Sequence, residues 1–285
     1  MIDLRENFAD AHWVLGVTSA LVGVGAAVST LEWLTIRYSL APGGLLSFDI
    51  VGSRAPFAGT GWFARIVRAL VSYQCYVVVL VLRALAVAGL PFMIFASAGR
   101  AVMVVALAVV LLSTALMQAR SPYGLDGSDQ MTMHIYGAAF VALALAGWNA
   151  IDLALYYIAA QSALSYVSSG VAKLASPIWR RGGVSYRVFN TRTYGFELAA
   201  RRLRDRPALS RFLDWTVIVV ESSFPLCLVV GYPVVFLFVF WGLGFHFINA
   251  VLMGLNSFFW AFVATYPALV FFALSVAPTS SASGQ

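Results

Sequence analysis

The chain has 285 residues, of which 61% are hydrophobic and only 11% are charged. Soluble domains have about a quarter of their residues charged, so this composition excludes a soluble fold and predicts an integral membrane protein. The net charge of +6 does not indicate nucleic-acid binding, because the basic residues cluster in connections that a membrane protein holds at the cytoplasmic face.

The apolar segments are long and do not alternate, which favours a helical bundle over a β-barrel. With about 20 apolar residues per crossing, the sequence predicts an all-α polytopic membrane bundle of about eight transmembrane helices. The expected spans are approximately 12–33, 73–95, 100–117, 135–147, 152–173, 212–230, 232–255 and 258–276. They form a single membrane domain over residues 1–277, and residues 278–285 are expected to be a disordered polar tail.

Two long connections between the expected spans are rich in arginine. Residues 35–72 contain GWFARIVRALV, which alternates basic and apolar side chains at helical spacing and is expected to lie flat at the membrane interface. Residues 175–214 contain nine arginines, and the stretch YGFELAARRLRDRP predicts a short amphipathic helix that ends at a proline. The positive-inside rule places both connections in the cytoplasm and both termini outside.

Lys173 lies at the end of an expected span that carries a polar stripe. Steps of four residues connect Gln161, Ser165, Ser169 and Lys173 on one side of this helix. In lipid such a stripe is costly unless it faces other helices or a water-filled cavity. The lysine can reach the interface as a structural residue, or a dry pocket can favour its neutral form, which acts as a base.

Two further spans contain polar residues that are candidates for the same site. His246 and Asn249 fall on one face of the seventh span, where they predict either a polar cavity or interhelical hydrogen bonds. Glu221 lies inside the sixth span, where it can balance the charge of Arg83 or of Lys173.

A polar turn precedes the fourth span. Asp129 in the stretch G-S-D-Q is typical of a helix N-cap or an Asx-turn, and it is also a candidate binding residue together with His134. No metal site is expected, because the three histidines are widely spaced and the sequence has no HExxH motif. Both cysteines lie in apolar segments, so a disulfide is not expected.

Several motifs carry a resemblance to a known family. The stretch G-V-A-K-L around Lys173, followed by Trp179 and two glycines, resembles the segment around the active-site lysine of vitamin K-dependent γ-glutamyl carboxylase and of the wider horizontally transferred transmembrane (HTTM) family. Glu221 before an apolar run, then F-H-x-x-N and G-x-x-x-F, looks like a later block of that family. The similarity covers residues 54–266. It implies that Lys173 is the base associated with oxygenation of a hydroquinone.

The small size and the block N-T-R-T-Y-G-F-E look more like the short bacterial branch of the family, typified by sporulation-delaying protein B. That branch belongs to systems that mature a secreted antimicrobial peptide toxin alongside a small partner protein. The resemblance therefore implies a multi-pass protein of the bacterial cytoplasmic membrane. Its expected partners are membrane lipid, a peptide precursor and a small partner protein.

The first hypothesis for function is maturation or export of such a peptide. Here Lys173 is a general base or a cation that binds a carboxylate, His246 carries or orients a proton, and Glu221 holds Lys173 or Arg83. We expect these groups to converge on one lipid-shielded chamber. The candidate substrate-binding residues are Arg83, Asp129, His134, Trp179, Tyr194 and Asn249.

Two other hypotheses remain open at the level of sequence. In one, the protein is a membrane oxygenase or carboxylase-like enzyme that uses a quinone or hydroquinone cofactor, and Lys173 deprotonates the quinol behind apolar walls that exclude water. In the other, the protein is a non-enzymatic membrane scaffold or immunity partner, and Lys173 and His246 are structural.

Overall fold

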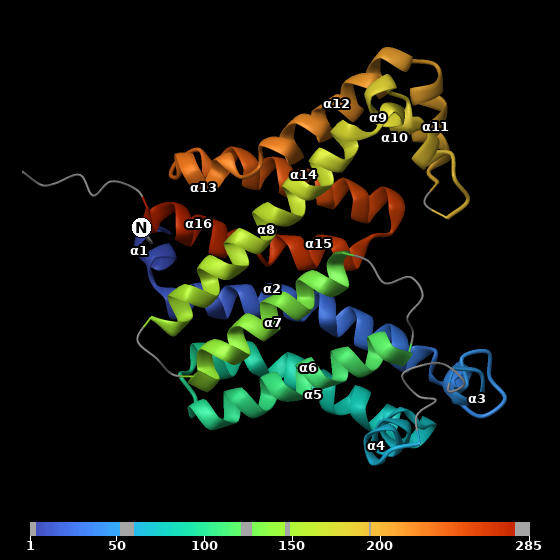
Figure 1. Ribbon diagram of the computed structural model, residues 1–285, viewed down its shortest axis with the longest axis vertical. Coiled ribbons are helices and arrows are strands. Elements are labelled where there is room, and N and C mark those ends of the chain that lie inside the picture. The colour runs from blue at the N-terminus through green and yellow to red at the C-terminus, as the bar shows by residue number, and fades with distance from the viewer. Residues whose placement is uncertain (1–3, 52–59, 121–126, 146–148, 194, 277–285) are drawn as a thin grey trace, which may run out of the picture.

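The computed structural model describes residues 4–51, 60–120, 127–145, 149–193 and 195–276, and every regular element in that part of the chain is a helix (Figure 1). The long helices are α2 (Ala11–Thr35), α5 (Tyr73–Phe95), α6 (Arg100–Arg120), α7 (Gly127–Leu145), α8 (Ala150–Ala175), α12 (Pro207–Ser223) and α14 (Val235–Met253). The last two helices are α15 (Asn256–Val263) and α16 (Tyr266–Ser275). The all-α prediction is confirmed.

Shorter helices connect the long ones or flank them. They are α1 (Leu4–Ala9), η1 (Arg37–Leu40), α3 (Phe48–Val51), α4 (Trp62–Val71), α9 (Pro177–Arg181), α10 (Val184–Phe189), α11 (Glu197–Arg204) and α13 (Leu226–Val230). Both predicted amphipathic helices form, as α4 and α11. In α4 the aromatic side chains of Trp62 and Phe63 are exposed, as expected for a helix that inserts one face into the membrane interface.

Five segments are long and apolar enough to cross a membrane, which makes the chain a multi-pass membrane protein. They are Ala11–Thr35, Tyr73–Phe95, Arg100–Arg120, Val235–Met253 and Asn256–Ser275. The prediction of eight spans is wrong by this measure, although helices form at all the predicted positions. The reason is that α7 and α8 carry polar residues along their length, and α12 has only 17 residues before the chain breaks at Phe224 and Pro225.

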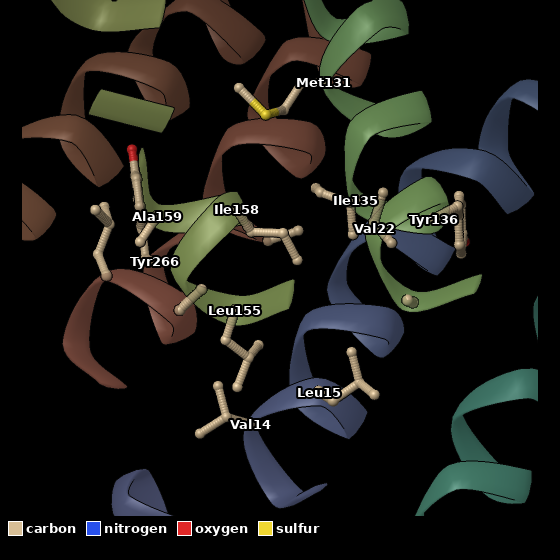
Figure 2. Close-up of a cluster of buried hydrophobic side chains, with 14 of the residues drawn as sticks. Val14, Leu15, Val22, Met131, Ile135, Tyr136, Leu155, Ile158, Ala159 and Tyr266 are labelled. Atoms are coloured by element: carbon tan, nitrogen blue, oxygen red, sulfur yellow. The ribbon is translucent and has the colours of Figure 1, made fainter. Parts of the chain in front are cut away.

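Helix α2 lies in the middle of the bundle, where it packs against α5, α7, α8, α15 and α16. Figure 2 shows Val14 and Leu15 of α2 close to Leu155 of α8, and Val22 close to Ile135 of α7. All five side chains are at most 1% exposed. This core holds α8 in place along its N-terminal half, and its C-terminal half then extends toward α12 (Figure 1).

The two arginine-rich connections lie at the same end of the bundle. Figure 1 places η1, α3 and α4 at the end where α2 stops, and α9, α10 and α11 at the same end, where α8 stops. The N-terminus lies at the opposite end. This arrangement agrees with the prediction that one side of the membrane holds both connections.

Candidate functional site

Lys173 and Glu221 form an ion pair between α8 and α12. The Nζ atom of Lys173 lies 2.5 Å from Oε2 of Glu221, and the side-chain exposures are 18% and 5%. Nζ also donates a hydrogen bond of 2.5 Å to the hydroxyl of Ser169, one helical turn earlier. The indole ring of Trp179 has its centroid 5.3 Å from Nζ, within the range of a cation–π contact. The last two members of the polar stripe of α8, Ser169 and Lys173, thus lie at the contact with α12, where their cost in lipid is reduced.

Gly170 explains how the two helices come close enough for this pair. A Cβ atom at position 170 would lie 2.3 Å from the backbone nitrogen of Ser222 and 2.7 Å from the carbonyl carbon of Glu221. Small residues at helix crossings allow such close approach in membrane bundles. In the stretch G-V-A-K the glycine thus brings α12 against α8, and the lysine one turn later meets the carboxylate.

His246 belongs to a second polar cluster, built from α8, α14 and α16. Its Nε2 atom shares a hydrogen bond of 2.8 Å with the hydroxyl of Tyr166, and that hydroxyl shares another of 2.8 Å with the hydroxyl of Tyr266. The ring of Phe262 stacks on the imidazole with centroids 4.6 Å apart. His246 is 3% exposed, and its Nδ1 atom has no hydrogen-bond partner in the described part of the chain.

The two clusters are neighbours along the same helix interface. Tyr166 precedes Lys173 by seven residues on α8, which corresponds to about 10 Å along the axis. The ring of Tyr166 stacks on Phe224, three residues after Glu221, with centroids 3.7 Å apart and planes 12° apart. The prediction that lysine, carboxylate and imidazole converge on one chamber therefore needs correction. Lys173 and Glu221 meet directly, whereas His246 bonds to Tyr166 in an adjacent layer.

Arg83 does not pair with Glu221. Its side chain is buried between α2, α5 and α6, where Nε donates a hydrogen bond of 2.9 Å to the hydroxyl of Thr30. One Nη atom donates to the hydroxyl of Thr114 and, at 3.4 Å, to the carbonyl oxygen of Val110. Hydroxyl and carbonyl oxygens thus stabilise a cation that is costly in the membrane interior. Glu221 instead pairs with Lys173.

The other predicted site residues are distributed over the bundle. Trp179 is next to the ion pair, as expected, and Asn249 is half-buried on α14, three residues after His246. Asp129 is the third residue of α7, so it lies in the first turn of the helix and not at the predicted N-cap position. Tyr194 lies outside the described residues.

His134 contacts α8 far from the ion pair. Its Nδ1 atom lies 2.6 Å from the hydroxyl of Tyr157. Tyr157 precedes Lys173 by 16 residues, or about 24 Å along the helix axis. His134 and Tyr157 line an otherwise apolar groove of about 430 Å³ between α7 and α8. This groove is thus separate from the Lys173–Glu221 pair.

Tyr166 and Arg120 are two buried polar residues that sequence reasoning missed. Tyr166 could have been found from its spacing, because seven residues separate it from Lys173 on the same face of a helix. Arg120 is 2% exposed at the end of α6, and it donates to the carbonyl oxygens of Val71, Leu40 and Leu46. It therefore ties the first arginine-rich connection to the bundle, and no motif in the sequence signals that contact.

We expect Tyr166→Phe to lower the free energy of unfolding by about 1–3 kcal/mol, because it leaves His246 Nε2 and the Tyr266 hydroxyl buried with one hydrogen bond fewer each. Thermal unfolding in detergent measures the effect. Tyr156→Phe is the matched control, since the Tyr156 ring also packs on aromatic side chains while its hydroxyl makes no hydrogen bond within the described residues. Equal melting temperatures for the two variants would contradict a structural role of the Tyr166 hydroxyl.

Comparison of the chain with models of protein families, with curated proteins and with solved structures found no match. The function is therefore inferred from the geometry of the site and from the motifs around Lys173. Of the predicted residues, the structure brings together Lys173, Glu221 and Trp179, and it adds Ser169 and Gly170.

Proposed function

We propose that the protein takes part in the maturation of a secreted peptide, and that Lys173 and Glu221 form the site that acts on the peptide precursor. The observation that carries the proposal is the 2.5 Å ion pair between these side chains at the end of α8. Removing two charges from water costs several kcal/mol per ion, and apolar residues often replace such pairs without loss of stability. An ionisable pair inside a membrane bundle is therefore by default a candidate functional site.

The geometry supports proton transfer as the chemistry of the pair. A proton that moves from Nζ of Lys173 to Oε2 of Glu221 leaves a neutral amine, which can accept a proton from a bound substrate. Glu221 keeps the first proton until Lys173 has returned the proton that it took from the substrate. The same ammonium can instead bind a substrate carboxylate that displaces Glu221. The 18% exposure of Lys173, beside Trp179, supports access from the interface.

His246 is assigned a positioning role in this proposal. Through its hydrogen bond to Tyr166 it orients a ring that stacks on Phe224, next to the turn of α12 that carries Glu221. The small partner protein implied by the resemblance would be the second component of the maturation system.

A quinol-dependent reaction at Lys173 is less well supported. The apolar groove with one hydrogen-bonded pair, His134 and Tyr157, has the character expected for a quinone ring and its tail. That groove lies about 24 Å along α8 from Lys173, however, so the lysine could not serve as base for a ring bound there.

Secreted peptides of the native producer test the proposal. We expect a peptide that is present in the wild type and absent after deletion of the gene to remain absent in a Lys173→Met strain with equal protein abundance. Glu197→Gln is the control, because Glu197 forms an exposed ion pair with Arg201 outside the site, and this strain should secrete the peptide normally. Mass spectrometry of the culture medium gives the readout. Unchanged secretion in Lys173→Met, or no peptide lost on deletion, would reject the proposal.

A further inference from the structure

An open groove of about 710 Å³ lies at the arginine-rich end of the bundle, between the α9–α10 turn and the start of α12. Its volume is within the range of small-molecule sites. Arg181 and Arg211 line it together with Phe212 and Trp215, so two cations and two aromatic rings face one hollow. None of these four residues belongs to the Lys173–Glu221 site.

Neither arginine has a carboxylate partner in the part of the chain that the structure describes. Among the described residues the ion pairs are Lys173–Glu221, Arg201–Glu197 and Arg204–Asp205. Arg211 is held in place by its own hydrogen bonds, because Nε and one Nη donate to the carbonyl oxygen of Arg181 at 3.2 and 3.0 Å. Its guanidinium group is therefore held in one orientation, and no carboxylate of the described residues pairs with it.

The nearest acidic residue along α12 is Asp214. It stabilises the structure around the groove and does not pair with either arginine. Asp214 is fully buried, and its oxygens accept from the backbone nitrogens of Val184 and Ser185 at 2.9 and 2.8 Å and from the Ser185 hydroxyl at 2.5 Å. These bonds hold the first residues of α10, and with them the turn before α10, against α12. Gly182 in this turn has φ +81°, and a Cβ there would lie 3.0 Å from the Arg211 side chain. The glycine thus leaves room for the arginine.

The groove continues onto an apolar strip of the same helix. Phe212, which directly follows Arg211, is three residues before Trp215, and Trp215 is four before Val219, so these three side chains share one face of α12. Their exposures are 66%, 37% and 56%. An exposed apolar face of this kind on a membrane protein is suited to contact with acyl chains, and aromatic rings beside cations are typical of the membrane interface.

We infer that this groove binds an anionic phospholipid. Its phosphate lies between the guanidinium groups of Arg181 and Arg211, and its acyl chains run along the strip of Phe212, Trp215 and Val219. Arginine suits this role because its planar group donates two parallel hydrogen bonds to phosphate oxygens. An acidic peptide would match the charges equally well but would gain nothing from an apolar strip that faces the bilayer, so the lipid is the better match.

Native mass spectrometry of the purified protein tests this inference. The protein is incubated with equal amounts of phosphatidylglycerol and phosphatidylcholine that have identical acyl chains. We expect the wild type to retain phosphatidylglycerol preferentially. In the double variant Arg181→Gln with Arg211→Gln, the ratio of retained phosphatidylglycerol to phosphatidylcholine should fall at least about tenfold. The control is Arg192→Gln with Arg202→Gln, which removes the same charge from exposed positions outside the groove lining and should keep the preference.

Further arms of the experiment separate the alternatives. Arg181→Gln alone disturbs no side-chain hydrogen bond in the described residues, so it gives a result even if the double variant does not fold. A soluble glycerol phosphate in excess should not displace the lipid, because it lacks acyl chains for the strip on α12. Displacement by it, displacement by a glutamate-rich peptide, or equal loss in the control variant would each overturn the inference.

Discussion

Replacing Lys173 with methionine is expected to lower the free energy of unfolding by about 3–5 kcal/mol, because it leaves the carboxylate of Glu221 buried without its partner. Glu221→Gln should cost less. Lys173 lies near the end of α8 and its long side chain can extend toward the interface when the carboxylate is removed. Thermal unfolding in detergent, with each single variant compared with the wild type, measures both effects.

The double variant Lys173→Met with Glu221→Gln completes a double-mutant cycle for this ion pair. Because it removes both charges together, it should regain much of the stability that Lys173→Met alone loses, and the coupling energy should exceed about 1 kcal/mol. Simple addition of the two single effects would mean that the side chains do not interact in the folded protein, and it would contradict the 2.5 Å pair.

A comparably large effect is expected from Gly170→Ala, with a loss of about 3 kcal/mol. The added Cβ would lie 2.3 Å from the Ser222 nitrogen, so α12 has to move away from α8, and backbone atoms cannot yield as a flexible side chain can. The displaced α12 should also separate Glu221 from Lys173, and peptide maturation should fall with stability.

Gly244→Ala on α14 is the matched control for this substitution. A Cβ at position 244 meets no atom within 4 Å, so the change should be neutral or stabilising by up to about 1 kcal/mol, since alanine favours a helix over glycine. The melting temperatures of the two variants in the same detergent provide the comparison. If Gly170→Ala is as stable as Gly244→Ala, the close crossing of α8 and α12 is wrong.

The sequence was sufficient to locate the helices. Long apolar runs bounded by polar turns predicted α2, α5 and α6 within a few residues, and helical spacing of arginines among apolar residues predicted α4 and α11. The predicted number of spans was wrong because polar residues along a helix have the same sequence pattern in two cases. They can face another helix within a membrane span, or they can mark a helix that is not apolar enough to be a span. In α8 the end of the stripe, Ser169 and Lys173, meets Glu221 of α12, which only the packing reveals.

The pairing of side chains could be predicted only in part. The alternatives for Glu221 were Lys173 and Arg83, and the choice depends on helix rotation, which a single sequence does not determine. Arg83 is satisfied by Thr30 and Thr114, but hydroxyl residues are common in membrane helices and give no distinct signal. Tyr166 shares a helix face with Lys173, and that spacing was a usable signal, although an aromatic residue in an apolar helix is by itself equally consistent with contact to lipid.

The most direct test of a functional Lys173–Glu221 pair inverts it, with Lys173→Glu and Glu221→Lys in one chain. Inversion keeps opposite charges at the crossing, so we expect stability well above that of Lys173→Glu alone. The amine would then lie on α12, away from its hydrogen bond to Ser169 and its contact with Trp179, and secretion of the mature peptide should remain absent at equal protein abundance. Full recovery of secretion by the inverted pair would show that these residues only hold α8 and α12 together.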